Sequence, residues 1–137
     1  MNVQTIMSRN PYTLHVGDTL AQAVELMSNE DIRHVPVLDN GRVAGIISDR
    51  DVKMALGPDA YELDLASIDP RMAEGPLSWF MSQEVVSVAP TDPLAAVAER
   101  FIELKVGALP VVEGGELVGI VSVLDVLRVA LPLLRKG

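Results

Sequence analysis

The chain repeats itself, and this repeat constrains its fold more than any other feature. Residues 3–52 align without a gap on residues 77–126 at an offset of 74, and 14 of the 50 pairs are identical. The chain is therefore a tandem duplication that builds one kind of unit twice. The identical pairs are Met7/Met81, Ser8/Ser82, Asp18/Asp92, Leu20/Leu94, Ala21/Ala95, Glu25/Glu99, Pro36/Pro110, Val37/Val111, Gly41/Gly115, Gly45/Gly119, Ile46/Ile120, Ser48/Ser122, Asp51/Asp125 and Val52/Val126.

Each copy begins with an amphipathic helix. Apolar residues recur at i, i+3, i+4 and i+7 in both copies, as Leu20, Ala23, Val24 and Met27 and as Leu94, Val97, Ala98 and Phe101. Asp18 and Asp92 stand where an N-cap is expected, and Pro93 stands at the first helical position. The sequence thus predicts two helix starts.

A hairpin follows each helix. Asn40-Gly41 lies between the apolar runs 35–38 and 43–47, and Glu113-Gly114-Gly115 separates 109–112 from 117–121. Asn-Gly between two β-rich runs predicts a type I′ turn, because both central residues need a positive φ. A Ser and a second helical stretch come next, so each copy is predicted to be strand, helix, strand, strand, helix, in the α/β (α+β) class.

One copy of about 50 residues is too small to bury a good core alone. We therefore expect the two repeats to pack on each other pseudo-symmetrically as one unit. The predicted boundaries are 1–56 for the first repeat, 57–76 for an acidic connector and 77–137 for the second repeat with its C-terminal helix. Because the connector also carries apolar residues, we expect it to dock on the repeats and to be partly helical; these residues are Tyr61, Leu63, Leu65 and Ile68.

The composition of the chain excludes several classes of partner and site. The net charge of −8 disfavours non-specific binding to a phosphate backbone or an anionic membrane, so neither nucleic acid nor membrane is an expected partner. The absence of Cys excludes disulfides and thiolate metal sites. No stretch approaches the roughly 20 apolar residues that span a bilayer, and the N-terminus lacks a signal-peptide pattern. We therefore expect a cytoplasmic protein.

Nothing in the sequence predicts catalysis. The two histidines, His15 and His34, have no metal-binding spacing, and no nucleophile or phosphate-loop motif is present. We expect no enzyme activity, no metal site and no required cofactor.

The segments around the two hairpins resemble the CBS (cystathionine-β-synthase-type) domain, a module that occurs in tandem as a Bateman pair. The resemblance covers nearly the whole chain. It rests on Arg33-His34-Val35-Pro36-Val37 and Gly45-Ile46-Ile47-Ser48-Asp49-Arg50-Asp51 in the first copy, and on Ala108-Leu109-Pro110-Val111-Val112 and Gly119-Ile120-Val121-Ser122-Val123-Leu124-Asp125 in the second.

The resemblance implies a sensor that binds AMP, ADP, ATP or S-adenosylmethionine in clefts between the repeats. It implies that the Asp of the Ser-x-x-Asp segment accepts hydrogen bonds from the ribose, and that the Ser lies near the phosphate. One site would then combine Thr13, Ile32, Arg33, His34, Val35 and Pro36 with Ser122 and Asp125. The other would combine Ser87, Val106, Gly107, Leu109 and Pro110 with Ser48, Arg50 and Asp51.

The chemistry of these residues suits a nucleotide. A carboxylate can accept both hydroxyls of a cis-diol, and free N–H groups at a helix start favour phosphate. Arg33 and His34 are candidate cations for the first site, and Arg50 and Lys53 for the second. The second pocket's own loop has Val106-Gly107 in place of charged residues, so we expect the sites to differ. One nucleotide per chain, or a different ligand in each cleft, fits this difference.

Each of these residues also has a simpler interpretation that involves no ligand. Ser-x-x-Asp is also a variant of the capping box, in which both residues only cap a helix. Arg33 and His34 fit a solvated surface, and Thr13 and Ser87 fit ordinary strand positions.

The second copy also carries surplus apolar helix residues, which usually indicate a partner. They are Phe101, Ile102 and Leu104 in one helix and Leu127, Val129, Leu131, Leu133 and Leu134 in the other. Because CBS pairs dimerise through their helices, the resemblance implies a homodimer that signals ligand binding to a regulated protein by changing conformation. The alternative is a ligand-free structural or protein-interaction dimer.

Overall fold

Both copies of the repeat form a helix, two strands and a second helix in the same order. The computed structural model describes residues 1–137. Its helices are α1 (Leu20–Glu30), α2 (Asp49–Leu56), α3 (Pro70–Ala73), α4 (Leu94–Leu104) and α5 (Val123–Arg135). Its strands are β1 (Ser8–Arg9), β2 (Leu14–His15), β3 (His34–Asp39), β4 (Arg42–Ser48), β5 (Ala108–Glu113) and β6 (Glu116–Ser122). The predicted α/β class is confirmed.

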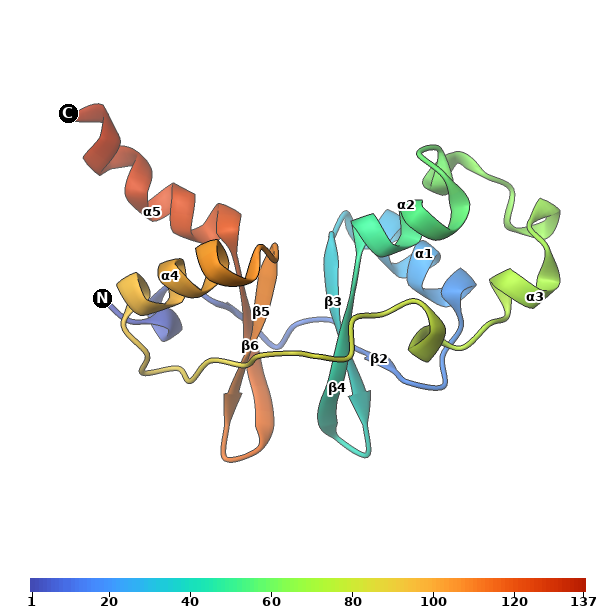
Figure 1. The fold of residues 1–137 in the computed structure, drawn as a ribbon, viewed down its shortest axis with the longest axis horizontal. Coiled ribbons are helices and arrows are strands. Elements are labelled where there is room, and N and C mark those ends of the chain that lie inside the picture. Colours follow the sequence, from blue (N-terminus) through green and yellow to red (C-terminus); the bar gives the residue numbers. More distant parts are fainter. The chain divides into compact units, whose positions relative to one another are not determined.

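The chain divides into two compact units that do not follow chain order (Figure 1). One unit is residues 12–85, and the other joins residues 1–11 to residues 86–137. Each unit has a three-stranded sheet, with order β2-β3-β4 in the first and β1-β6-β5 in the second. Packing of the two repeats into one pseudo-symmetric body stays a prediction.

In the unit of residues 12–85, α1 and α2 cover the sheet (Figure 1). β2 pairs parallel with β3, and β3 pairs antiparallel with β4. The apolar stripe predicted for α1 is buried as expected. It joins strand residues in the core, which contains Leu20, Ala23, Val24, Met27, Val35, Val37, Ile47, Val52, Ala60 and Leu77.

The unit of residues 1–11 and 86–137 repeats this arrangement with α4 and α5. Val88 bridges Val111 in parallel, at the same repeat positions as Leu14 and Val37. The first strand of the second copy is thus reduced to one bridge. The core of this unit contains Val3, Val88, Val97, Phe101, Leu109, Val111 and Val121.

The two copies exchange their first segments. Ser8 pairs with Ile120 in β6, whereas Ser82, its repeat equivalent, pairs with Ile46 in β4. Each copy therefore supplies a segment to the sheet of the other copy. In Figure 1 the N-terminal turn (blue) lies beside α4 for this reason.

Both hairpins have the predicted turn. The φ angles are 51° and 80° at Asn40 and Gly41, and 60° and 82° at Gly114 and Gly115. All four residues are in the left-handed region that a type I′ turn requires. The predicted hairpins are confirmed.

The predicted helix starts are wrong by one residue. α1 is capped by Thr19, whose hydroxyl accepts from the Gln22 N–H at 3.2 Å, and α4 has Pro93 at its N-cap. Asp18 and Asp92 instead close the preceding turns, where their carboxylates accept from the N–H groups of His15 and Ala89 at 2.8 and 3.0 Å. A carboxylate can accept a hydrogen bond from the backbone N–H three residues earlier whether or not a helix begins at that position.

The segment between the repeats packs on the core of residues 12–85. It contains α3 and short 3-10 turns at Ala60–Glu62 and Leu65–Ser67. Ala60 is fully buried, and Tyr61 and Leu65 pack against the same cluster. No helix of the chain has the length and apolar character needed to cross a membrane.

Candidate functional site

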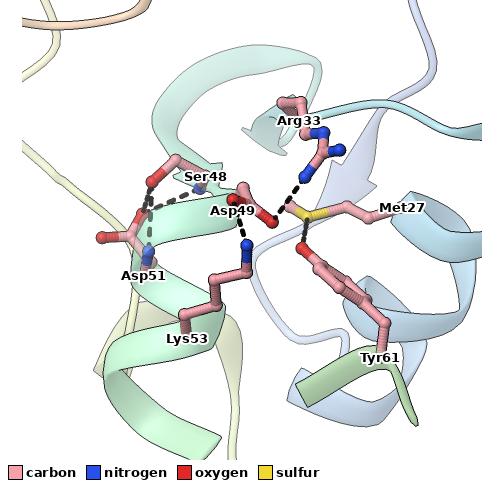
Figure 2. Close-up of polar contacts among 7 residues, drawn as sticks. All are labelled: Met27, Arg33, Ser48, Asp49, Asp51, Lys53 and Tyr61. Atoms are coloured by element: carbon pink, nitrogen blue, oxygen red, sulfur yellow. Dashed lines mark hydrogen bonds and ion pairs between the residues drawn. The ribbon is translucent and has the colours of Figure 1, made fainter. Parts of the chain in front are cut away.

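Each unit places a serine and an aspartate together at the start of a helix. Ser48 caps α2, and the Asp51 carboxylate accepts from the Ser48 N–H at 2.8 Å and from its hydroxyl at 2.9 Å (Figure 2). Ser122 caps α5, and the Asp125 carboxylate accepts from the Ser122 N–H at 2.8 Å. Both Ser-x-x-Asp segments are therefore capping boxes, as the simpler interpretation predicts.

The capping boxes lie on one edge of each sheet. Ile46 exchanges two backbone hydrogen bonds with Ser82, at 3.1 and 3.0 Å, so its N–H and C=O point away from β3. Because backbone direction alternates along a strand, the N–H of Ser48, two residues later, also points away from β3. It points to Asp51, which places this carboxylate on the same edge.

The main chain of His34 points to the opposite edge. His34 lies across from Ser48, and Pro36 lies across from Ile46, so neither pair exchanges hydrogen bonds between β3 and β4. The outer edge of β3 is paired with β2 from Leu14 onward. The pairing cannot continue past Pro36, because proline has no N–H to donate. The pairing of the sheet thus supplies no partner for the N–H and C=O of His34.

The second unit has the same geometry at Ala108. The Pro110 C=O accepts from the Val88 N–H at 3.0 Å, and the Val123 N–H donates to the Gly107 C=O at 3.0 Å. The backbone of Ala108, between them, therefore points to the Val88 edge. Thr13 and Ser87, both exposed, immediately precede the paired residues of this edge in their units.

The predicted site residues differ in what they can offer a ligand. Val35, Pro36, Leu109 and Pro110 are buried in the two cores, so only their main chain can reach a ligand. Arg33, Arg50 and Val106 are exposed, and Ile32 and Gly107 are half-buried. Each predicted cleft draws on residues of both units, so the pairing of these half-sites stays a prediction.

A carboxylate that the sequence analysis did not single out organises the charges around α2. Asp49 Oδ1 lies 3.3 Å from Arg33 Nη1, and Asp49 Oδ2 lies 3.2 Å from Lys53 Nζ (Figure 2). Two of the cations proposed for phosphate binding are thus already paired. The i, i+4 spacing of Asp49 and Lys53 on a helix is the signal that could have predicted half of this cluster.

The cluster changes the pKa values of two side chains, Asp49 and Tyr61. Burial alone would raise the pKa of Asp49, but the nearby Tyr61 hydroxyl, the Lys53 ammonium and the charge of Arg33 outweigh it and lower the pKa. Burial, followed by the nearby Asp49 carboxylate, raises the pKa of Tyr61 well above its usual value. The Tyr61 hydroxyl points to Met27 Sδ at 3.5 Å (Figure 2). Asp49 is therefore ionised, and Tyr61 protonated, at neutral pH.

His34 is a poorer cation than the sequence suggests. Burial lowers the pKa of its imidazole, although the charges of Asp49 and Asp51 act in the opposite direction. Without a ligand, His34 is therefore charged less readily than a free imidazole, and its role beside a phosphate stays a prediction. Arg50, which forms no ion pair, is the free cation of this region.

The two half-sites on the helix starts are unequal. Asp51 Oδ1 has no hydrogen-bond partner, whereas Asp125 Oδ1 lies 3.2 Å from Arg128 Nη1. At the repeat positions of Asp49, Arg50 and Lys53 the second copy has Val123, Leu124 and Leu127. The expected difference between the two copies is therefore visible in charge and in hydrogen bonding.

An open hollow of about 150 Å³ lies next to the charged cluster. It is lined by Met27, Ser28, Asp31, Ile32, Arg33 and Tyr61. No group of three or more His, Asp or Glu side chains is placed to hold a metal ion.

The sequence of both repeats matches a known family. The model of the CBS domain matches residues 3–58 and 77–132. The chain belongs to the CBS domain family. This CBS pair is 28% identical over 135 residues to a CBS domain-containing protein of Dictyostelium discoideum, covering 97% of this chain and 93% of that protein. It is 30% identical to an A-adding tRNA nucleotidyltransferase of Geobacter sulfurreducens, but spans only 13% of that enzyme.

Solved structures share the fold of this CBS pair. A Vibrio cholerae protein named for acetoin utilization is 37% identical with a TM-score of 0.78, covering 98% of this chain and 93% of that one. CBSX2 in complex with AMP is 25% identical with a TM-score of 0.77, and the match covers 98% of both chains. A CBS pair in complex with 5′-methylthioadenosine and S-adenosyl-L-methionine is 25% identical with a TM-score of 0.77, covering 94% and 98%.

Proposed function

We propose that this CBS pair is a regulatory sensor that binds an adenosine-containing ligand between its repeats. AMP, ADP, ATP and S-adenosylmethionine are the candidate ligands. Binding changes the conformation of the pair, and a regulated protein reads this change. The match to the A-adding tRNA nucleotidyltransferase covers only 13% of that enzyme, which supports a regulatory role for the CBS pair rather than a catalytic one. The proposed setting is the cytoplasm.

One observation carries the proposal: each sheet has polar groups suited to a ligand on both of its edges. One edge has a capped helix start with a carboxylate, and on the other the main chain of His34 or Ala108 points away from the neighbouring strand β4 or β6. Ribose hydroxyls suit the carboxylate, phosphate suits the helix start, and adenine suits main-chain donors and acceptors. A complete site then needs one edge from each unit, in the two combinations predicted from the resemblance.

Two solved relatives support the class of ligand. One was determined with AMP and the other with 5′-methylthioadenosine and S-adenosyl-L-methionine. The shared part of these molecules is adenosine. The charged cluster at α2 suits a phosphate, through Arg50, better than the apolar α5 start does.

The test is calorimetric titration of the purified protein with AMP, ADP, ATP and S-adenosylmethionine, beside native mass spectrometry for a retained ligand. Asp51→Asn and Asp125→Asn preserve shape and one capping oxygen but remove an acceptor for the ribose. Each charge-assisted hydrogen bond is worth about 1.5–3 kcal/mol. We therefore expect affinity to fall about 10- to 100-fold at the affected site.

Asp92→Asn is the matched control, because Asp92 closes a turn through the Ala89 N–H and is absent from both predicted sites. Its affinity should equal that of the unmodified protein. No heat on titration and no retained ligand would refute the sensor.

That result would favour the second candidate, a ligand-free structural dimer. The observation in its favour is that both capping boxes are complete without any ligand. In either case we propose a homodimer, because exposed apolar side chains remain on α4 and α5.

A further inference from the structure

The open hollow of about 150 Å³ lies at the C-terminal end of α1. Met27, Ser28, Asp31, Ile32 and Arg33 line it, and Tyr61 from the connector completes the lining. Clefts that hold drug-sized ligands have roughly 300–1,000 Å³. The hollow therefore suits a molecule much smaller than a nucleotide.

The hollow is separate from the Ser48–Asp51 capping box. Figure 2 shows Asp51 on one flank of the first turn of α2, and Asp49 on the other flank, together with Arg33 and Tyr61. Residues two apart on a helix do not face each other, which is why the two carboxylates diverge. Because Arg33 and Tyr61 line the hollow, it lies on the Asp49 flank.

The end of α1 brings negative charge to the hollow. The last carbonyl groups of a helix carry a partial negative charge, which a basic residue in the last turn offsets. α1 has no basic residue there, and both its last residue, Glu30, and its C-cap, Asp31, are acids. Glu30 accepts from the Tyr12 hydroxyl at 2.8 Å, whereas Asp31 forms no ion pair. This helix end suits a cation that the chain itself does not supply.

The second copy has the opposite charge at the same helix end. Lys105, the counterpart of Asp31, is the C-cap of α4. Both residues have a left-handed backbone, with φ of 56° at Lys105 and 51° at Asp31. A lysine at this position offsets the helix dipole, and an aspartate adds to it. The first copy thus has an acid where its own duplicate has the favoured cation.

Arg33 brings positive charge to the same hollow. Its counterpart in the second copy is Gly107, so this charge is also specific to the first copy. Arg33 Nη1 lies 3.3 Å from Asp49 Oδ1, and the arginine side chain is 58% exposed. A guanidinium presents several N–H donors in a planar fork, and the contact with Asp49 uses one nitrogen. The other donors are free to bind a carboxylate.

We infer that the hollow binds a small zwitterion of the α-amino acid class, with its ammonium at Asp31 and the end of α1 and its carboxylate at Arg33. An anion alone would be repelled by Asp31, and a cation alone by Arg33. Met27 and Ile32 offer apolar contact to the side chain of the ligand. Because the hollow is open, we expect a dissociation constant on the order of 1 mM. This site goes beyond the proposed nucleotide sensor and does not depend on it.

An NMR titration tests the site. Proton–nitrogen amide spectra of the labelled protein are recorded with each common L-α-amino acid in turn. No nucleotide is added, because Ile32 and Arg33 also belong to a predicted nucleotide cleft. We expect at least one amino acid to shift the amide signals of Ser28, Asp31 and Arg33 in a saturable way. Its N-acetyl derivative, which lacks the ammonium, and its amide, which lacks the carboxylate, should bind about 10- to 100-fold more weakly.

Variants of the two charged residues give the second measurement. Asp31→Asn and Arg33→Gln should each weaken binding about 10- to 100-fold. Asparagine tolerates the left-handed backbone of position 31, so the fold should persist. Glu30→Gln is the matched control, because it removes the neighbouring acid, which does not line the hollow, and its affinity should equal that of the unmodified protein.

Two results would overturn the inference. One is the absence of saturable shifts at Ser28, Asp31 and Arg33 with every amino acid. The other is equal affinity for an amino acid and its two blocked derivatives, which would show that the ligand's charges are not what the hollow recognises. Neither result bears on nucleotide binding, which has its own titration.

Discussion

At the scale of single residues, the repeat explains why two glycines stand where they do. A Cβ atom on Gly45 would lie 2.5 Å from the Ser82 carbonyl oxygen and 2.9 Å from Met81 Sδ. A Cβ on Gly119 would lie 2.7 Å from Met7 Sδ and 2.9 Å from the Ser8 carbonyl oxygen. Three of the identical pairs in the repeat therefore describe one contact, made twice: a Met-Ser segment crossing a glycine.

Gly45→Ala should destabilise the protein by about 1–3 kcal/mol, because backbone atoms must move to admit the methyl group. Gly17→Ala is the control, since the nearest atom to its Cβ, His15 Nδ1, is 3.5 Å away, which is ordinary contact. Urea unfolding of both variants measures the difference. Equal stability of the two would show that the Met81-Ser82 segment does not lie on Gly45.

His34 should make stability depend on pH. Because burial lowers its pKa in the folded state, the unfolded state binds a proton first as the pH falls through about 6.5, and stability decreases. His34→Gln should therefore lose less stability than the unmodified protein between pH 7 and pH 5, in denaturant titrations at each pH. His15→Gln controls for the other histidine, and the same loss in His34→Gln and the unmodified protein would contradict the prediction.

At the scale of elements, the starts of α2 and α5 have two roles in the proposed function: each is capped by its own side chains, and each binds part of the ligand. Ser48 and Ser122 satisfy the N–H groups at the starts of α2 and α5, and the adjacent acids close each box. The same geometry leaves other N–H groups of the first turn pointing at solvent, where an anion can bind. Capping and ligand binding are therefore compatible, and stability measurements can separate them.

Ser122→Ala should cost about 1 kcal/mol of stability without any ligand, because the Asp125 N–H loses its acceptor. Ser122→Thr, which keeps the hydroxyl, should cost less. Thermal unfolding of the ligand-free variants measures both. Unchanged stability in Ser122→Ala would mean that the serine has no structural role and matters only to a ligand.

The sequence predicted the elements better than it predicted their ends and their charges. Hairpins were predictable because Asn40-Gly41 has one strongly preferred turn. The helix start at Thr19 was missed because Asp18, one residue earlier, is an equally good acceptor for a local N–H. The role of Asp49 was missed because its partner Arg33 lies in a different element, and only the folded sheet brings them together. The candidate site residues were found through the resemblance, whereas the two-edged arrangement of each sheet needed the hydrogen-bond pattern.

At the scale of the whole molecule, each unit depends on a segment from the other copy. Val3 is fully buried in the core that contains Phe101, and its repeat equivalent Leu77 is fully buried in the core that contains Leu20. The segment at the start of the chain thus completes the sheet that β5 and β6 form near its end. A boundary drawn in chain order would cut through both cores.

Val3→Ala and Leu77→Ala should therefore loosen the copy that each residue does not belong to in sequence. In hydrogen exchange followed by mass spectrometry, Val3→Ala should speed exchange in α4 and β6, and Leu77→Ala in α1 and β3. Leu77→Ala should cost about 2–5 kcal/mol, and Val3→Ala less because fewer atoms are removed. Faster exchange confined to α1 and β3 in Val3→Ala would contradict the exchanged arrangement.

The exchanged segments also bear on how such a chain could arise. A protein with one repeat would carry both the Met-Ser segment and the glycine-bearing strand that receives it, so two such molecules could complete each other. Joining the two copies in one chain turns that encounter into an intramolecular one, with an effective concentration set by the connector rather than by the cell. Duplication then makes permanent, at any dilution, an assembly that separate copies would form only when abundant.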